Sequence, residues 1–281
     1  MVGQQRKIRM IALDLDNTTL RTDKSLAPRT KAALEESIRQ GVKVVVSTGR
    51  AFLSLPKDIL AIDGLEYVIN SNGACITRLH DGEKIMTSYL GGDRVDAVAA
   101  ILKEYDYPVE TFSDGKAFTD QKVYNDLKEN GSSFRTTAYV LWSRTPVPDI
   151  WDHLEATKSR IENISVTIPD PAEKEAVRKR LSAIDGLTIT SSVTFNIEIE
   201  GPNTSKATAL QFLLDRAGIS REALMACGDS PNDIEMIRLA GLGVAVGNAE
   251  PEVRAAADYV TDTNDRDGVA KAIERFVLKR Y

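Results

Sequence analysis

The sequence predicts an α/β protein whose core is a Rossmann-like, doubly wound parallel sheet, interrupted by an inserted α+β domain. Near both ends of the chain, short β-branched runs alternate with helical patterns, which is typical of a parallel sheet covered on both faces. Between these regions the segments are less apolar and lose this alternation. The chain has 281 residues, of which 42% are hydrophobic, so it is long enough for two domains with buried cores.

Apolar runs in the first part of the chain predict three strands of the parallel sheet. These runs are residues 9–14 (RMIALD), 42–50 (VKVVVSTGR) and 66–74 (EYVINSNGA). A helix is predicted over residues 28–41, because Pro28 is allowed in a first helical turn and the apolar residues recur on one face. Residues 74–90 then predict a hairpin.

The inserted domain is predicted over residues 91–198, in the order helix, two strands, helix, strand, helix and strands. The core then comprises residues 1–90 and 199–281, so both ends of the chain build one sheet. In its second part, helices are predicted at 205–218, 231–241, 251–257 and 267–279, and strands at 223–229, 242–247 and 258–262.

Charge and composition exclude several classes of protein. The formal net charge is −5, so no basic surface favours nucleic acid or anionic lipid. The two cysteines, Cys75 and Cys227, are far apart in the sequence, which predicts a reducing compartment rather than a disulfide framework. No apolar stretch is long enough for a signal peptide or a membrane span, so we expect a cytoplasmic protein.

Polar side chains gather where three of the predicted parallel strands end. Asp14 and Asp16 end the first strand, and side chains two apart on an extended segment point the same way. The other two strands end in Thr48, Gly49 and Arg50 and in Asp229, Asn232 and Asp233. Because functional groups gather beyond the carboxyl ends of parallel strands, these residues predict one shared pocket.

Such a pocket suits a phosphate group held together with a divalent cation. Clustered carboxylates repel one another unless a cation or a proton intervenes, and Mg²⁺ accepts a few carboxylates while keeping positions for a phosphate oxygen. Thr48, Lys206 and Asn232 can each hold a phosphoryl oxygen, as can backbone N–H groups in the turn that begins at Leu15. We therefore predict Mg²⁺ as the cofactor and a small phosphorylated metabolite as the partner, with the oligomeric state left open.

Four ordered motifs resemble those of the haloacid dehalogenase (HAD) superfamily of phosphatases. They are DLDNT at 14–18, STGR at 47–50, the lysine of NTSKATAL at 206, and GDSPND at 228–233. The insertion between the second and third motifs resembles the class IIB cap of Cof-type sugar-phosphate phosphatases. One motif alone is weak, but four in this order across the whole chain are specific. The resemblance implies a Mg²⁺-dependent phosphatase of small phosphomonoesters, with a cap that sets substrate specificity.

The resemblance also implies a role for each matching residue. Asp14 matches the nucleophile that becomes an aspartyl phosphate, and Asp16 matches the general acid and base. Thr48 matches the hydroxyl that binds the transferring phosphoryl group, Lys206 the cation that orients Asp14, and Asn232 a further phosphate contact. Leu15, Gly49 and Arg50 complete the predicted phosphate-binding set. The implied metal ligands are Asp14, the backbone carbonyl of Asp16, Asp229 and, as a further ligand or supporting carboxylate, Asp233.

Two other functions stay open at this point. A phosphomutase of the same fold would return the phosphoryl group to a second hydroxyl instead of to water. A phospho-accepting signalling domain also clusters Asp, Thr and Lys around Mg²⁺, although such domains are shorter and need neither a cap nor an acid placed like Asp16.

Several single residues also have plain structural interpretations. Lys206 fits a surface lysine in a first helical turn, Asp233 a helix N-terminal acid, and Arg50 a turn residue. Asn72 and Gly73 resemble part of a family loop beside the pocket, as do Asn264 and Gly268, but ordinary turn chemistry explains both pairs equally well.

Overall fold

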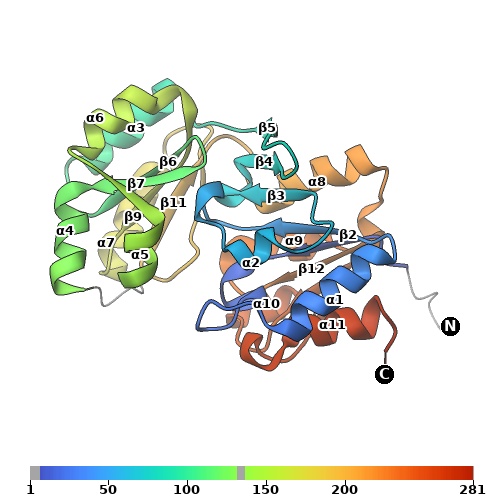
Figure 1. Cartoon of the computed structure of the whole chain (residues 1–281). Coiled ribbons are helices and arrows are strands. Elements are labelled where there is room, and N and C mark those ends of the chain that lie inside the picture. Colours follow the sequence, from blue (N-terminus) through green and yellow to red (C-terminus); the bar gives the residue numbers. More distant parts are fainter. Residues whose placement is uncertain (1–6, 132–136, 281) are drawn as a thin grey trace. The chain divides into compact units, whose positions relative to one another are not determined.

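The computed structural model of the protein describes residues 7–131 and 137–280, and the chain folds into two compact units (Figure 1). Unit 1 comprises Met1–Thr48, Pro56–Ile85 and Ser205–Tyr281, and unit 2 comprises Gly49–Leu55 and Met86–Thr204. Residues 49–55, which directly follow a strand of unit 1, therefore group with unit 2. The division of roles between a catalytic core and a specificity domain stays a prediction.

Unit 1 is built on an eight-stranded sheet in the order β14-β13-β12-β1-β2-β3-β4-β5. The strands are β1 (Met10–Leu13), β2 (Lys43–Ser47), β3 (Tyr67–Asn70), β4 (Cys75–Arg78), β5 (Lys84–Thr87), β12 (Leu224–Gly228), β13 (Leu242–Ala245) and β14 (Tyr259–Val260). The last two residues of β5 group with unit 2. All pairs from β14 to β3 are parallel, and β3 pairs antiparallel with β4. Because β1 lies between β12 and β2 and is parallel to both, the carboxyl ends of these three strands lie at the same edge of the sheet. The predicted α/β fold is confirmed.

Among the helices of unit 1, α8 (Lys206–Ala217) has a recognised sequence signal at each end. The others are α1 (Pro28–Arg39), α2 (Lys57–Leu60), α9 (Ile234–Leu239), α10 (Pro251–Ala256) and α11 (Gly268–Phe276). Helices α1 and α11 pack together on one side of the sheet, and α8 lies on the other side (Figure 1). Ser205 caps α8 by accepting a hydrogen bond from Thr208 N (3.2 Å), and Gly218 ends the helix with a left-handed φ of 60°.

Unit 2 contains a six-stranded sheet in the order β10-β11-β9-β6-β7-β8. Its elements are α3 (Gly92–Leu102), β6 (Val109–Ser113), β7 (Lys116–Asp120), α4 (Gln121–Asn130), α5 (Thr137–Ser143), β8 (Arg144–Val147), α6 (Ile150–Thr157), β9 (Ile161–Thr167), α7 (Pro171–Leu181), β10 (Thr188–Thr190) and β11 (Asn196–Glu200). One sheet face, with Ile164 and Val166, joins a buried apolar cluster with α3, α6 and α7. The other face carries Glu110, Ser165 and Glu198, aligned across β6, β9 and β11. One face is therefore apolar and the other polar.

The inserted region contains more elements than its sequence pattern predicts. In particular, the next described element after α4 is a second helix, α5, whose sequence TAYVLWS is rich in residues that favour strands. Val140 of this helix is 1% exposed, and the Tyr139 ring packs under the guanidinium groups of Arg50 and Arg144. Tertiary packing therefore outweighs the local strand propensity in this segment.

The sequence predicts neither a signal peptide nor a membrane span. The first six residues, on which the signal-peptide expectation partly rests, lie outside the described part of the chain. Within residues 7–131 and 137–280, no helix combines the length and the hydropathy that crossing a bilayer requires.

Candidate active site

Asp14 stands at the end of a strand that is completely buried. All four residues of β1 are buried, and the Asp14 backbone N–H donates to the carbonyl oxygen of Cys227 (3.0 Å). Its carbonyl oxygen accepts a hydrogen bond from Thr19 Oγ1 (2.6 Å). Asn17 has a left-handed backbone (φ 57°), a conformation that asparagine tolerates, and this turns the chain after Asp16. The Asp14 carboxylate is thus held at the carboxyl edge of the sheet, and the residue is 6% exposed.

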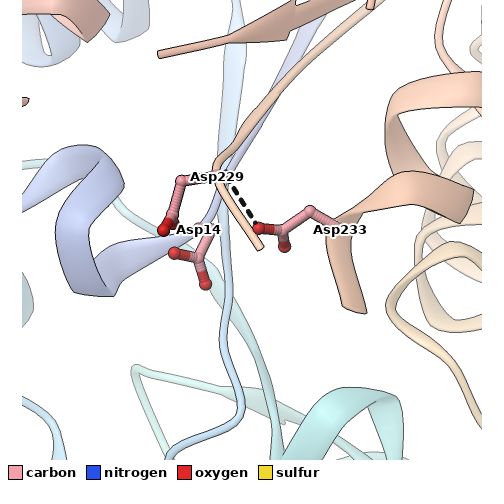
Figure 2. Close-up of side chains that lie close together, drawn as sticks. All are labelled: Asp14, Asp229 and Asp233. Atoms are coloured by element: carbon pink, nitrogen blue, oxygen red, sulfur yellow. Dashed lines mark hydrogen bonds between the residues drawn. The ribbon is translucent and has the colours of Figure 1, made fainter. Parts of the chain in front are cut away.

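The turn after β12 is organised by the carboxylate of Asp233. Its Oδ2 accepts hydrogen bonds from the backbone N–H groups of Asp229 (3.0 Å) and Ser230 (3.1 Å), the first of which is drawn in Figure 2. Gly228 makes this close approach possible, since a Cβ at this position would lie 2.5 Å from the Asp233 Cβ. The GDSPND motif therefore needs its glycine to bring Asp229 and Asp233 together.

Lys206 is the first residue of α8 and is 1% exposed. Its Nζ donates to Asp14 Oδ1 (2.7 Å) and to Asp233 Oδ1 (2.6 Å). A lysine is rarely buried to this degree without charged partners, and these two carboxylates supply them. The interpretation of Lys206 as a surface lysine is therefore wrong.

The side chains of Asp14, Asp229 and Asp233 converge from β1, from β12 and from the turn before α9 (Figure 2). One carboxylate oxygen of each residue lies within 4.8 Å of the others. With Lys206 as the ammonium that contacts two of them, the four ionised side chains leave a formal charge of −2 in a buried position. This charge has to be balanced by protons or by a cation.

The pKa values of the cluster reflect this excess of negative charge. Burial raises the pKa of Asp14 well above its usual range, with Asp233 and Asp229 acting in the same direction and Lys206 opposing them. Burial, supported by Asp233, raises the pKa of Asp229 to about 6. Burial opposes the charge of Lys206, but Asp14 and Asp233 outweigh it and raise the pKa of the lysine. Lys206 therefore stays protonated, and the carboxylates are the groups that need a counter-charge.

The arrangement of donors fits a hard divalent cation. Thr18 Oγ1 donates to Asp229 Oδ1 (2.6 Å) and Ser230 Oγ donates to Asp229 Oδ2 (3.0 Å), and such contacts orient a metal-binding carboxylate. Asp233 already accepts from Lys206 and from two backbone N–H groups. Asp14, Asp229 and Asp233 could each offer an oxygen to a cation, and Asp233 in addition holds the turn and the lysine through these hydrogen bonds.

Asp16 does not join this carboxylate group among the residues that the structure describes. Its side chain is 35% exposed and forms an ion pair with Lys24 (3.0 Å between Nζ and Oδ1). Lys24 has a left-handed backbone (φ 70°) inside a short loop closed by a bridge between Leu20 and Leu26. The predicted general acid is thus partly exposed and is held by a neighbouring ammonium group.

The remaining predicted residues fall into two groups. Leu15 and Thr48 are buried in unit 1, and the Asn232 side chain, also in unit 1, donates from Nδ2 to Asn72 Oδ1 (3.1 Å). Gly49 and Arg50 instead group with unit 2. There the Arg50 guanidinium donates to the Ser54 carbonyl oxygen (3.1 Å) and lies 4.6 Å from the centre of the Tyr139 ring.

Three side chains that contact the predicted site residues were not predicted from the sequence. Thr18 and Ser230 orient Asp229, and Lys24 contacts Asp16. Thr18 and Ser230 lie inside the DLDNT and GDSPND motifs, so their places in these motifs could have identified them as neighbours of the site. Nothing in the local sequence marks Lys24, because its contact depends on how the loop at 21–25 folds back.

Comparisons with known proteins identify the family of the chain. A profile of the haloacid dehalogenase-like hydrolase family matches residues 11–273. Over 271 residues the chain is 32% identical to 5-amino-6-(5-phospho-D-ribitylamino)uracil phosphatase YcsE of Bacillus subtilis (strain 168), covering 96% of each protein. The solved structure of a haloacid dehalogenase-like hydrolase from B. subtilis has a TM-score of 0.81 at 28% identity, covering 95% of this chain and 99% of that one. A HAD subclass IIB sugar phosphatase, at 23% identity, has the same fold, with a TM-score of 0.80 and coverage of 95% and 98%.

The family match spans nearly all of the chain, including the strands that hold the carboxylate cluster. The relative above 30% identity is matched along almost its full length, so the likeness is not confined to one motif. The family predicted from the four motifs is thereby confirmed. The chain belongs to the haloacid dehalogenase-like hydrolases, in their Cof-type branch, and is an enzyme of the phosphoric monoester hydrolase class.

Proposed function

We propose that the protein is a Mg²⁺-dependent phosphatase that hydrolyses small phosphomonoesters, such as sugar phosphates, through an aspartyl phosphate on Asp14. One observation carries this proposal: a buried carboxylate, Asp14, is held by Lys206 beside Asp229 and Asp233 with an excess of negative charge. A cluster that served stability alone would not leave this charge uncompensated. A divalent cation supplies the missing positive charge and can hold a phosphate oxygen in its remaining positions.

In the first half of the reaction, an oxygen of Asp14 attacks the phosphorus of the substrate. Lys206 holds Oδ1 and so fixes the direction of the carboxylate. The bond between phosphorus and the leaving oxygen breaks, and Asp16 donates a proton to that oxygen. The products of this step are the free alcohol and a phosphoryl group bound to Asp14.

In the second half, water attacks the phosphorus of the aspartyl phosphate. Asp16, now a carboxylate, accepts a proton from the water, and the bond between phosphorus and the Asp14 oxygen breaks. Inorganic phosphate leaves and both aspartates return to their starting states. Throughout the cycle the Lys206 ammonium and the Thr48 hydroxyl stabilise the charge on the phosphoryl oxygens.

Asp14 and Asp229 are the proposed side-chain ligands of the cation, with the backbone carbonyl of Asp16 as a further oxygen. When bound, Mg²⁺ would offset part of the negative charge of the carboxylates and the phosphate, which would lower the repulsion between the attacking carboxylate and the phosphoryl group. Thr18 and Ser230 keep Asp229 oriented for this role.

The proposed substrates are phosphorylated sugars or polyols. The relative from B. subtilis is named for a phosphate ester of a ribityl chain, which supports a test of polyol phosphates. Unit 2 is the proposed specificity domain, and the polar face of its sheet, with Ser165 and Glu198, carries groups of the kind that hydrogen-bond hydroxyls.

The proposal is tested by measuring phosphate release from a panel of sugar, polyol, nucleotide and pyridoxal phosphates, with Mg²⁺ and with EDTA. Wild type should release phosphate only with the metal, and Asp14→Asn should lose turnover by on the order of 10³-fold or more while its circular dichroism is unchanged. Appreciable turnover by Asp14→Asn would overturn the role of Asp14. Transfer to a second hydroxyl of a sugar bisphosphate, without phosphate release, would establish a mutase instead.

A further inference from the structure

The loop between β3 and β4, residues 71–73, has an unusual backbone in a buried place. Ser71, Asn72 and Gly73 all have left-handed φ angles, of 50°, 54° and 101°. Ser71 is fully buried and Asn72 is 2% exposed. Asparagine tolerates this conformation but serine does not favour it, and a run of three such residues persists only where surrounding contacts determine it.

The loop is held firmly by the hairpin from which it projects. Ala74 N donates to the Ser71 carbonyl oxygen (3.0 Å), and Asn70 Nδ2 donates to Ser71 Oγ (3.3 Å). Thr77 Oγ1 in turn donates to Asn70 Oδ1 (3.1 Å). These bonds place Asn72 and Gly73 at a defined position beyond the carboxyl end of β3.

From that position the loop contacts three separate parts of the candidate site. The backbone N–H of Asn72 donates to the Thr48 carbonyl oxygen (3.1 Å), and its side-chain Oδ1 accepts from Asn232 Nδ2 (3.1 Å). Gly73 packs directly on the backbone of Ser205, because a Cβ at this position would overlap the Ser205 carbonyl oxygen and lie 3.1 Å from Lys206 N. Thr48, Lys206 and Asn232 come from different elements and are the three side chains predicted to hold phosphoryl oxygens.

The Asn232 amide depends on this loop for its orientation. Within residues 7–131 and 137–280, its Nδ2 bonds to Asn72, and its buried Oδ1 has no hydrogen-bond partner. Removal of the Asn72 side chain would therefore take away the hydrogen bond that orients this amide. The position of the Asn232 side chain is therefore set by Asn72.

We propose that the loop Ser71–Gly73 is a positioning element that holds Thr48, Lys206 and Asn232 in one arrangement for the phosphoryl group, with Asn72 acting through Asn232. The inference rests on the proposed phosphatase function. It assigns a purpose to the NSNGA segment beyond that of an ordinary turn. The strained backbone is kept because only this path brings one loop against three phosphate-binding residues.

A double-mutant cycle tests the action of Asn72 through Asn232. Asn72→Gly removes the side chain but keeps the left-handed backbone accessible, so it isolates the hydrogen bond. With a substrate that the wild type turns over, Asn72→Gly should lower kcat/KM about three- to tenfold, the range for one hydrogen bond, and Asn232→Ala at least as much. The double variant should match Asn232→Ala, because the two residues act as one unit.

Two outcomes would contradict the positioning role of the loop. Losses that multiply in the double variant, or a lower melting temperature with an unchanged kcat/KM per active molecule, would show that the loop is structural only. Absence of turnover in the wild type would count against the proposed function instead. In that case the side-chain amide signals of Asn232 in ¹⁵N NMR decide the inference: they should change in Asn72→Gly, and unchanged signals would overturn it.

A glycine pair tests the contact with Lys206. Gly73→Ala and Gly41→Ala place the same side chain at positive φ, 101° and 83°, but Gly41 has no atom within 4 Å of the new Cβ. Both variants should lose stability from backbone strain, and only Gly73→Ala should also lose kcat/KM, by more than tenfold, through displacement of Ser205 and Lys206. Equal kinetic effects in the two variants would refute the positioning of Lys206 by the loop.

Discussion

Unit 1 and unit 2 both bury charged side chains at a sheet, but the charges balance differently. In unit 2, Arg144 donates to Glu110 (2.8 Å), and both side chains are at most 10% exposed. In unit 1, Lys206 shares its charge between Asp14 and Asp233, while Asp229 lies within 4.8 Å of both carboxylates. The pair in unit 2 is neutral by itself, whereas the cluster in unit 1 carries excess negative charge.

The difference in net charge distinguishes an ion pair that stabilises the fold from a cluster that is proposed to act in catalysis. A buried pair with matched charges completes its interactions within the fold. A buried cluster with unmatched charge is costly unless something from solution completes it, and such costs are typical of active sites. The proposed function places the cation at the unit 1 cluster, and the two clusters offer matched experiments.

The largest difference is expected when the buried cation of each cluster is removed. Lys206→Met should lower kcat/KM by on the order of 10³-fold, because the phosphoryl charge loses its ammonium partner. Arg144→Met should keep turnover within about tenfold per folded molecule, since that cation balances only unit 2. Steady-state kinetics normalised to folded protein measure both. Comparable losses in the two variants would erase the proposed distinction.

The stability of unit 2 provides the second test. Arg144→Met alone leaves Glu110 buried without its cation and should cost about 3–5 kcal/mol of unfolding free energy. Glu110→Leu/Arg144→Met should recover most of this loss, because it removes both charges of the pair. Both tryptophans, Trp142 and Trp151, lie in unit 2, so tryptophan fluorescence during urea unfolding reports on this unit.

A double variant as unstable as Arg144→Met would show that the pair contributes more than its charge balance. The packing of Arg144 over the rings of Phe112 and Tyr139, 5.6 and 5.3 Å from their centres, would then be the contribution to examine.

The pH dependence of the unfolding free energy of the metal-free protein provides the third test. Because the pKa of Asp229 is raised to about 6 in the folded protein, folding favours its protonated form. The unfolding free energy should therefore fall as the pH rises from about 4, near the pKa of an unfolded aspartate, through 6. Asp229→Asn removes this titration, so in EDTA it should be more stable than wild type at pH 7 and differ little at pH 4.

Urea unfolding followed by circular dichroism at the two pH values measures this effect. Mg²⁺ should stabilise the wild type and leave Asp229→Asn nearly unchanged, by mass action of a ligand that binds the folded state. A gap between the two proteins that stayed constant from pH 4 to pH 7 would contradict the assigned titration.

The smallest effect concerns the thiol beside the cluster. Burial, with the charge of Asp233, raises the pKa of Cys227 to about 12, and Cys75 is also fully buried. Neither thiol should react with a disulfide reagent at pH 8 in the folded protein, and both should react in denaturant. Rapid labelling of Cys227 in the native state would show that the site opens more than the structure indicates.

Much of this architecture is visible in the sequence because it follows from local chemistry. Buried strands read as β-branched runs, and the acids of DLDNT and GDSPND stand where parallel strands end, so their convergence follows from the sheet. Arg50 and helix α5 could not be placed in this way. Residues 49–55 group with unit 2 through contacts far away in the sequence, and α5 is helical despite its strand-forming residues.

The sequence by itself therefore determined the fold class, the family and the chemical types of the site residues, since these depend on periodicity and on short motifs. Only the tertiary structure decided which partners these residues meet. It buries Lys206 between two carboxylates, leaves Asp16 beside Lys24, and joins Asn72 to Asn232 across 160 positions of the chain. Such contacts depend on distance in space, and no local pattern of the chain encodes that distance.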